Sequence, residues 1–211
     1  MSSPPAAVPL PMFPLGSVLF PHVPLALHVF EERYRALVRD VLRHGQEFGV
    51  VLIERGAEVG GGDTRFGVGT VARVVEALAL PDGRWQLLCL GARRFTVAAW
   101  LPDDPYPVAL VEDRPERPAG PSGAAALARA EAEVRRCLAL AGELGEPAAP
   151  AGVRLADDPA VAGHQLAAVA PLGPVDHQRL LEVDDPAERL ALLAELAAEA
   201  AGLLAFRLSA G

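Results

Sequence analysis

The sequence predicts an α+β protein in two parts: a small closed β-barrel with one inserted helix, followed by a four-helix bundle. Three observations lead to this fold class. Residues 8–113 contain roughly six short apolar runs of strand type and a single helical pattern, separated by turns rich in glycine and proline. Residues 114–121 are rich in proline and charge, which is typical of a linker. Residues 122–208 are rich in alanine and leucine at helical spacing.

The first part opens with two short apolar pieces, residues 12–13 and 18–20, which we expect to form strands separated by prolines. A helix is expected to open at His28, with acidic residues in its first turn and Gly45 as its C-cap. The apolar side of this helix recurs at helical spacing: Tyr34, Leu37, Val38, Val41 and Leu42.

An uninterrupted apolar run at residues 48–53 is typical of a fully buried strand, and a glycine-rich loop is expected at residues 56–63. Four more strands are expected, at residues 66–76, 85–90, 93–100 and 106–112. The first two are joined by a turn at Pro81-Asp82-Gly83, where proline presets φ and glycine allows positive φ. So many short strands favour a closed barrel, because closure removes exposed edges.

Capping residues divide the second part into four helices. Ser122 is expected to cap the first, and the second begins at Asp158 with a proline in its first turn. A short third helix is expected over residues 175–183. Asp185 and Glu188 then form a capping box that starts the last helix.

The composition argues against several classes of function and location. The net charge of −8 and the pI near 5.1 argue against a nucleic-acid partner, because phosphates require a basic face. The amino terminus lacks the basic region of a signal peptide, and no stretch of about 20 residues is uncharged, so no membrane span is expected. Cys89 and Cys137 match neither a metal motif nor a disulfide framework. We therefore expect a cytoplasmic protein with two reduced, buried thiols.

All 19 basic residues are arginine, and lysine is absent. A P-loop needs a lysine ammonium on the nucleotide phosphates. A Ser–Lys protease dyad needs a lysine that can lose its proton, which arginine cannot do. Both chemistries are therefore excluded within these 211 residues.

A family resemblance rests on an opening run, LPMFPLGSVLFPHVPLALHVFEERY, and on five later pieces in the same order: residues 48–51, 67–75, 80–84, 91–95 and 105–106. These pieces resemble the amino-terminal domain of Lon-type ATP-dependent proteases, which is their substrate-binding module. The resemblance continues more loosely through the helical part. It implies a PUA-like barrel, no cofactor and no catalytic role. Together with the missing lysines, it implies a stand-alone recognition domain.

No catalytic or metal site is expected. Residues 67–72 superficially match a dinucleotide fingerprint, but the glycines are expected inside a strand. Ser122 follows a proline-rich segment and is read as a helix cap, not as a nucleophile. Glu31 and Arg33 are read as a local ion pair at a helix start. No metal-ligand spacing is found among the five histidines, His22, His28, His44, His164 and His177.

The remaining candidate site is apolar. The rigid segment containing Pro21, Val23 and Pro24 is expected between a strand and the helix, where it either forms a contact patch for an apolar chain or plugs one end of the barrel. Tyr106, in a second proline-rich loop, has the same two interpretations. These four residues are the candidates for binding a peptide.

The leading hypothesis is a non-catalytic binding protein that recognises exposed hydrophobic segments of unfolded polypeptides, with handover to a separate protease in protein quality control. An alternative is a small-molecule or RNA-binding protein, since PUA-like barrels include such members; the acidic charge argues against RNA. A third is a hydrolase that uses Ser122.

Overall fold

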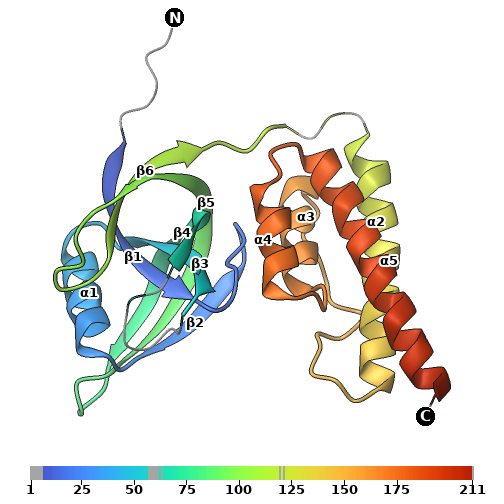
Figure 1. The fold of residues 1–211 in the computed structure, drawn as a ribbon, viewed down its shortest axis with the longest axis horizontal. Helices are drawn as coiled ribbons and strands as arrows, with labels where there is room; N and C mark the ends of the chain where they lie inside the picture. Colours follow the sequence, from blue (N-terminus) through green and yellow to red (C-terminus); the bar gives the residue numbers. More distant parts are fainter. Residues whose placement is uncertain (1–6, 57–61, 63, 119, 121, 211) are drawn as a thin grey trace, which may run out of the picture. The chain divides into compact units, whose positions relative to one another are not determined.

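The computed structural model describes residues 7–56, 62, 64–118, 120 and 122–210. The chain divides into two compact units, residues 1–115 and 116–211. Across the described residues, the first unit contains six strands and one helix and the second contains four helices, so the chain is α+β (Figure 1). Most of the glycine-rich loop expected at residues 56–63 lies outside the described residues.

The strands of the first unit form one mixed sheet in the order β2-β5-β4-β3-β1-β6, with an additional pairing of β5 and β6. β1 pairs with β3 in parallel, and the other pairs are antiparallel. The strands are β1 (Val8–Leu15), β2 (Pro24–Val29), β3 (Glu47–Arg55), β4 (Thr64–Ala79), β5 (Trp85–Trp100) and β6 (Val108–Arg114). Among the described residues, β2 pairs with β5 alone, whereas each of the other strands has at least two partners.

The opening of the chain differs from the prediction. Residues 18–20 form a loop, not a strand, and Leu19 and Phe20 are buried in it. His28 lies in β2, and the helix α1 (Glu32–Arg43) begins later than expected. In β2 the residues alternate between exposed and less exposed, which is the period of a strand on a sheet surface. Proline at its first position, Pro24, is compatible with an edge strand.

Two strands predicted separately, at residues 85–90 and 93–100, are one strand, β5. Gly91 falls between these two predicted strands, where a glycine is typical of a turn. It lies in the continuous strand, where a methyl group in place of its hydrogen would overlap the backbone oxygen of Phe20. Glycine is needed there for a close approach of two backbone segments, not for a turn.

The core of the first unit contains one cluster of buried apolar residues that joins α1 to strands β1 to β5 and another around Met12 and Phe95. The rings of Phe13 and Tyr34 stack with centroids 4.2 Å apart, and Phe48 lies next to Phe13. The predicted apolar face of α1 is confirmed, because its buried residues include Tyr34, Leu37, Val38 and Val41. Cys89 is a buried free thiol of this core, as expected.

The second unit contains α2 (Gly123–Glu143), α3 (Pro159–Val169), α4 (Pro174–Glu182) and α5 (Pro186–Ala210). The expected caps of α3 and α5 are confirmed: Asp158 accepts hydrogen bonds from two amides of α3, and Asp185 from two amides of α5. Ser122 precedes α2 but makes no capping hydrogen bond with its side chain. The long helices α2 and α5 pack through small and apolar residues, Cys137, Ala141, Ala201 and Leu204. A regular four-helix bundle stays a prediction.

A polar cluster joins the start of the second unit to its helices. Arg189 on α5 is buried, and its Nη1 donates to Glu116 Oε1 at 2.7 Å. Its Nη2 donates to the backbone oxygen of Val183 at 2.8 Å. His164 Nε2 on α3 lies 3.5 Å from Glu116 Oε2. Burial alone would raise the pKa of Glu116, but the hydrogen bonds and charges of His164 and Arg189 outweigh burial and lower this pKa to about 2.

Gly69 and Gly67 of β4 provide a matched test of the sheet packing. A methyl group on Gly69 would overlap the backbone oxygen of Val50 and lie 2.6 Å from Cζ of Phe95, whereas one on Gly67 meets nothing within 4 Å. We expect Gly69→Ala to lower the free energy of unfolding by about 2–4 kcal/mol and Gly67→Ala to change it by less than ~0.5 kcal/mol. Urea denaturation followed by circular dichroism measures both. Equal effects would contradict this packing.

The low pKa of Glu116 predicts acid sensitivity. In the unfolded chain this carboxyl protonates near pH 4.5, whereas in the folded chain it stays ionised to about pH 2. Its contribution to stability, about 1–3 kcal/mol, is therefore complete above pH ~5 and is lost as the pH falls from 4.5 to 2. Unfolding followed by circular dichroism at 222 nm gives the free energy of unfolding at each pH. We expect this free energy to fall less steeply with decreasing pH in Glu116→Gln than in the wild type. Parallel slopes in the two proteins would contradict the assignment.

Candidate functional site

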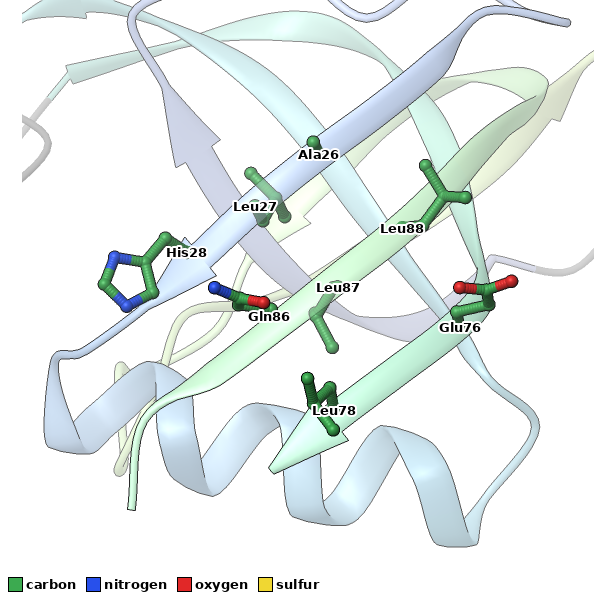
Figure 2. A pocket seen from close by; sticks show the side chains of 8 residues that line it. All are labelled: Ala26, Leu27, His28, Glu76, Leu78, Gln86, Leu87 and Leu88. Atoms are coloured by element: carbon green, nitrogen blue, oxygen red, sulfur yellow. The ribbon is translucent and has the colours of Figure 1, made fainter. Parts of the chain in front are cut away.

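Strands β2, β5 and β4 lie side by side (Figure 2). Alternate residues of β2 and of the first part of β5 are exposed, and residues 75–79 of β4 are all exposed. The register places these residues in three rows across the strands: Pro24–Leu90–Arg73, Ala26–Leu88–Glu76 and His28–Gln86–Leu78. We call the apolar members of the rows the outer patch: Pro24, Ala26, Leu78, Leu88 and Leu90. The patch combines residues of β4 and β5, which are consecutive in the sequence, with residues of β2, which lies much earlier in the chain.

The outer patch is exposed to an unusual degree for leucine. Leu78 is 58% exposed, Leu88 39% and Leu90 40%, whereas the intervening Leu87 and Cys89 are buried in the core. Isolated exposed apolar residues are common, but a contiguous group on one regular face marks an interaction surface. The three leucines therefore form the strongest candidate site in the first unit.

A shallow depression of about 460 Å³, the outer hollow, lies within this face (Figure 2). Ala26, Leu78 and Leu88 line it together with three polar residues, His28, Glu76 and Gln86. Glu76 is its one carboxylate, and no ion pair to Glu76 occurs within the described part of the chain. The outer hollow is thus apolar with a residual negative charge.

A second depression, of about 200 Å³, borders β2 beside β1 and the start of α1. We call it the edge hollow. Phe13, Leu15 and Tyr34 line it from the core, and Phe30, which is 53% exposed, lies at its border. Both hollows are lined by residues 26–28 of β2, so this short strand separates two apolar depressions.

The structure separates the four residues proposed for peptide binding. Pro21 is buried, because its segment packs against β5 near Gly91. Val23 is partly buried and packs on the core. Tyr106 packs on the same core, where its hydroxyl donates to Asp40 Oδ2 at 2.9 Å. Pro24 alone is exposed and belongs to the outer patch.

The expected local ion pair is confirmed. Arg33 Nε lies 3.1 Å from Glu31 Oε2, and the Arg33 guanidinium lies 4.4 Å from the ring centre of Tyr34. Glu31 occupies the N-cap position of α1 without a capping hydrogen bond from its side chain. The pair thus orients the chain where β2 leads into α1.

The arrangement offers little for catalysis. Residues 67–72 lie within β4, as expected, and do not open a helix. Within the described ranges, no three His, Cys, Asp or Glu residues gather as a metal site would require. Burial raises the pKa of the Cys89 thiol to about 11, so it is protonated at neutral pH and a poor nucleophile. None of the described helices is long and apolar enough to span a membrane.

The outer patch is not predicted from the sequence alone. Most of it lies in two runs, PLALHV and WQLLCL, of which the first was assigned to a loop and a helix start. The second run is apolar on both faces and reads as a buried strand. Only the register shows that its outward leucines lie beside Pro24 and Ala26.

The chain is similar to known proteins in sequence and in fold. A family model described as the ATP-dependent protease La (LON) substrate-binding domain matches residues 9–199. A solved Lon N-terminal domain protein from Xanthomonas campestris is 32% identical, with a TM-score of 0.64 over 88% of this chain and 96% of that one. The N-terminal domain of a Mycobacterium avium complex Lon protease has a TM-score of 0.63 at 15% identity, covering 91% of this chain and 99% of that one, which shows a likeness of fold.

Curated relatives are longer. Lon protease 1 of Myxococcus xanthus is 30% identical over 89% of this chain and 24% of its own length. The Lon protease of Desulfovibrio desulfuricans is 31% identical over 87% of this chain and 21% of its own length. The chain therefore spans about a quarter of the length of these relatives.

Leu88 and Leu87 test the separation of outer patch and core. We expect Leu88→Asp to change the free energy of unfolding by less than ~1 kcal/mol, because its side chain lies on the outward face and is 39% exposed, so that a carboxylate there can reach water. Leu87→Asp would bury an unpaired charge and is expected to cost more than ~3 kcal/mol. Chemical denaturation distinguishes the two. Severe destabilisation by Leu88→Asp would show that the outer leucines serve the fold.

Proposed function

The chain belongs to the family of Lon substrate-binding domains, and on that premise we propose that it recognises exposed hydrophobic segments of unfolded polypeptides. Recognition consists of burying apolar side chains, and no bond is made or broken. The family's relation to Lon proteases supports polypeptides as the ligand class. Handover of bound segments to a separate protease in the cytoplasm is part of the same proposal.

The single observation that carries the proposal is the outer patch. Its leucines extend from a regular sheet face that the core does not need, and they lie beside the outer hollow. Burial of apolar surface contributes roughly 25 cal/mol per Å², so a few hundred Å² supports only weak to moderate binding after entropy losses. Such affinity suits transient capture of many different segments.

The charge distribution supports a polypeptide over nucleic acid. The chain carries a net charge of −8, and Glu76 lies within the outer hollow. A phosphate backbone would be repelled, whereas a neutral or basic unfolded segment would not. We accordingly propose that clients are apolar segments with neutral or basic flanks.

The proposal also assigns roles to the residues first considered for binding. Pro24 contacts the ligand directly as a member of the outer patch. Pro21, Val23 and Tyr106 act by holding the loop before β2 and the core beneath it. The ring of pairings β1-β3-β4-β5-β6 is proposed to close as a PUA-like barrel that keeps this surface rigid.

Binding to a permanently unfolded protein tests the proposal. The probe is a fluorescein-labelled, reduced and carboxamidomethylated model protein, whose blocked cysteines are uncharged, and the readout is fluorescence anisotropy with the full 211-residue chain. We expect saturable binding that weakens about ten-fold or more in Leu88→Asp, because a charge would enter the apolar contact.

The matched control is Leu203→Asp. It makes the same substitution at a leucine of α5 that is 69% exposed, and it is expected to leave binding unchanged. Equal affinity of wild type and Leu88→Asp would contradict the outer patch as the site. Absence of binding up to about millimolar concentration would contradict the proposed function.

A further inference from the structure

We infer that the bound polypeptide adds to the sheet as an extra strand along the open edge of β2. This inference rests on the proposed function and specifies how the segment is held: by backbone hydrogen bonds to β2 in addition to apolar contacts. Strand addition to a sheet edge is a general way of binding an extended chain without reading its sequence strictly.

The backbone of β2 is suited to such pairing. In an antiparallel pair, alternate residues direct their N–H and C=O groups to the partner, and the others direct them away. The amide of Gly91 donates to the oxygen of Val23 at 2.9 Å, so Val23 directs its backbone oxygen to β5. This bond fixes which residues of β2 face β5 and which face the open edge. By alternation, Leu25 and Leu27 bond to β5, whereas Ala26 and His28 direct their groups to the open edge.

The position of Pro24 is compatible with this alternation of backbone groups. It occupies a position whose N–H would point away from β5, so its lack of a donor costs the ladder nothing. Ala26 and His28 are exposed, and no other strand pairs with β2 from the far side within the described part of the chain. Two backbone N–H groups and the carbonyls on the same side are thus available to one added strand.

The two hollows match the side chains of an added strand. Successive side chains of a strand point to opposite faces. Those on the outer face would lie beside Ala26, whose single methyl group leaves Leu88 within reach. Those on the other face would enter the edge hollow, against Phe13 and Leu15. An extended segment with apolar side chains on both faces therefore fits the edge better than a helix would.

Charge and area favour an unfolded segment over a second copy of this chain. Two copies, each with a net charge of −8, repel one another, and Glu76 adds negative charge near the edge. β2 has six residues, which provide far less contact than the roughly 1,200 Å² that stable dimers bury. The occupant is accordingly a neutral or basic extended polypeptide.

Amide exchange on the full chain tests the inference. The probe is a soluble ten-residue peptide whose six central residues alternate leucine and valine, so that both faces are apolar, with two lysines at each end; it is added to the ¹⁵N-labelled protein. We expect saturating peptide to slow exchange of the Ala26 and His28 amides about ten-fold or more. The amides of Leu25 and Leu27, already bonded to β5, serve as internal controls and are expected to change little.

A pair of variants gives a second readout. Ala26→Pro removes one N–H at the open edge, and Ala26→Val keeps this donor and adds a branched side chain suited to a strand. We expect Ala26→Pro to bind the peptide about five-fold or more weakly than Ala26→Val, which corresponds to the loss of one hydrogen bond. If Ala26→Pro does not fold, amide exchange on the wild type still decides.

The outcomes separate this inference from the function beneath it. Peptide binding that is lost in Leu88→Asp but leaves the Ala26 and His28 amides unchanged would overturn strand addition and retain the outer patch. No peptide binding would overturn both. Slow exchange of these amides in a peptide-free dimer, detected by sedimentation, would show that a second copy occupies the edge and would overturn the assigned occupant.

Discussion

Strand β5 is the element on which the first unit depends, because it pairs with three other strands. β4 follows one of its sides, and the other side is shared: residues 85–90 pair with β2 and residues 94–100 with β6. The change of partner falls at Gly91, where a side chain would overlap the backbone of Phe20. Glycine at this point lets the loop before β2 pass against β5. As a result, β6 takes the rest of that side and β2 remains a short edge strand.

The same strand explains how an apolar surface can exist without serving the fold. Residues 87–90 alternate between a buried face, which packs on α1 and the neighbouring strands, and an outward face that carries two exposed leucines. The buried members contribute most to stability, because they leave water almost completely on folding. The outward leucines remain 39% and 40% exposed, so part of their apolar surface is still open to water. Strand β5 therefore carries apolar side chains on both of its faces.

Local signals in the sequence predicted much of the fold. The helix α1, the buried strand β3 and the aspartate caps of α3 and α5 depend on neighbouring residues, and all were placed correctly in kind. Residues 18–20 and His28 were placed wrongly, because their conformation depends on β5, which lies far along the chain: Phe20 packs against Gly91, and His28 pairs with Gln86. The outer patch was missed for the same reason: its rows join residues from three strands, and no local pattern records such a register.

An open edge beside apolar residues invites aggregation, and the chain carries features that oppose it. β2 is only six residues long and begins with Pro24, and both features limit pairing with another copy. The net charge of −8 adds repulsion between copies but not against a neutral or basic unfolded segment. These features also cap affinity, since two outward amides and a few leucines offer few contacts. Weak binding suits a recognition module, because a segment that is held only briefly can be passed on, whereas tight binding would retain it.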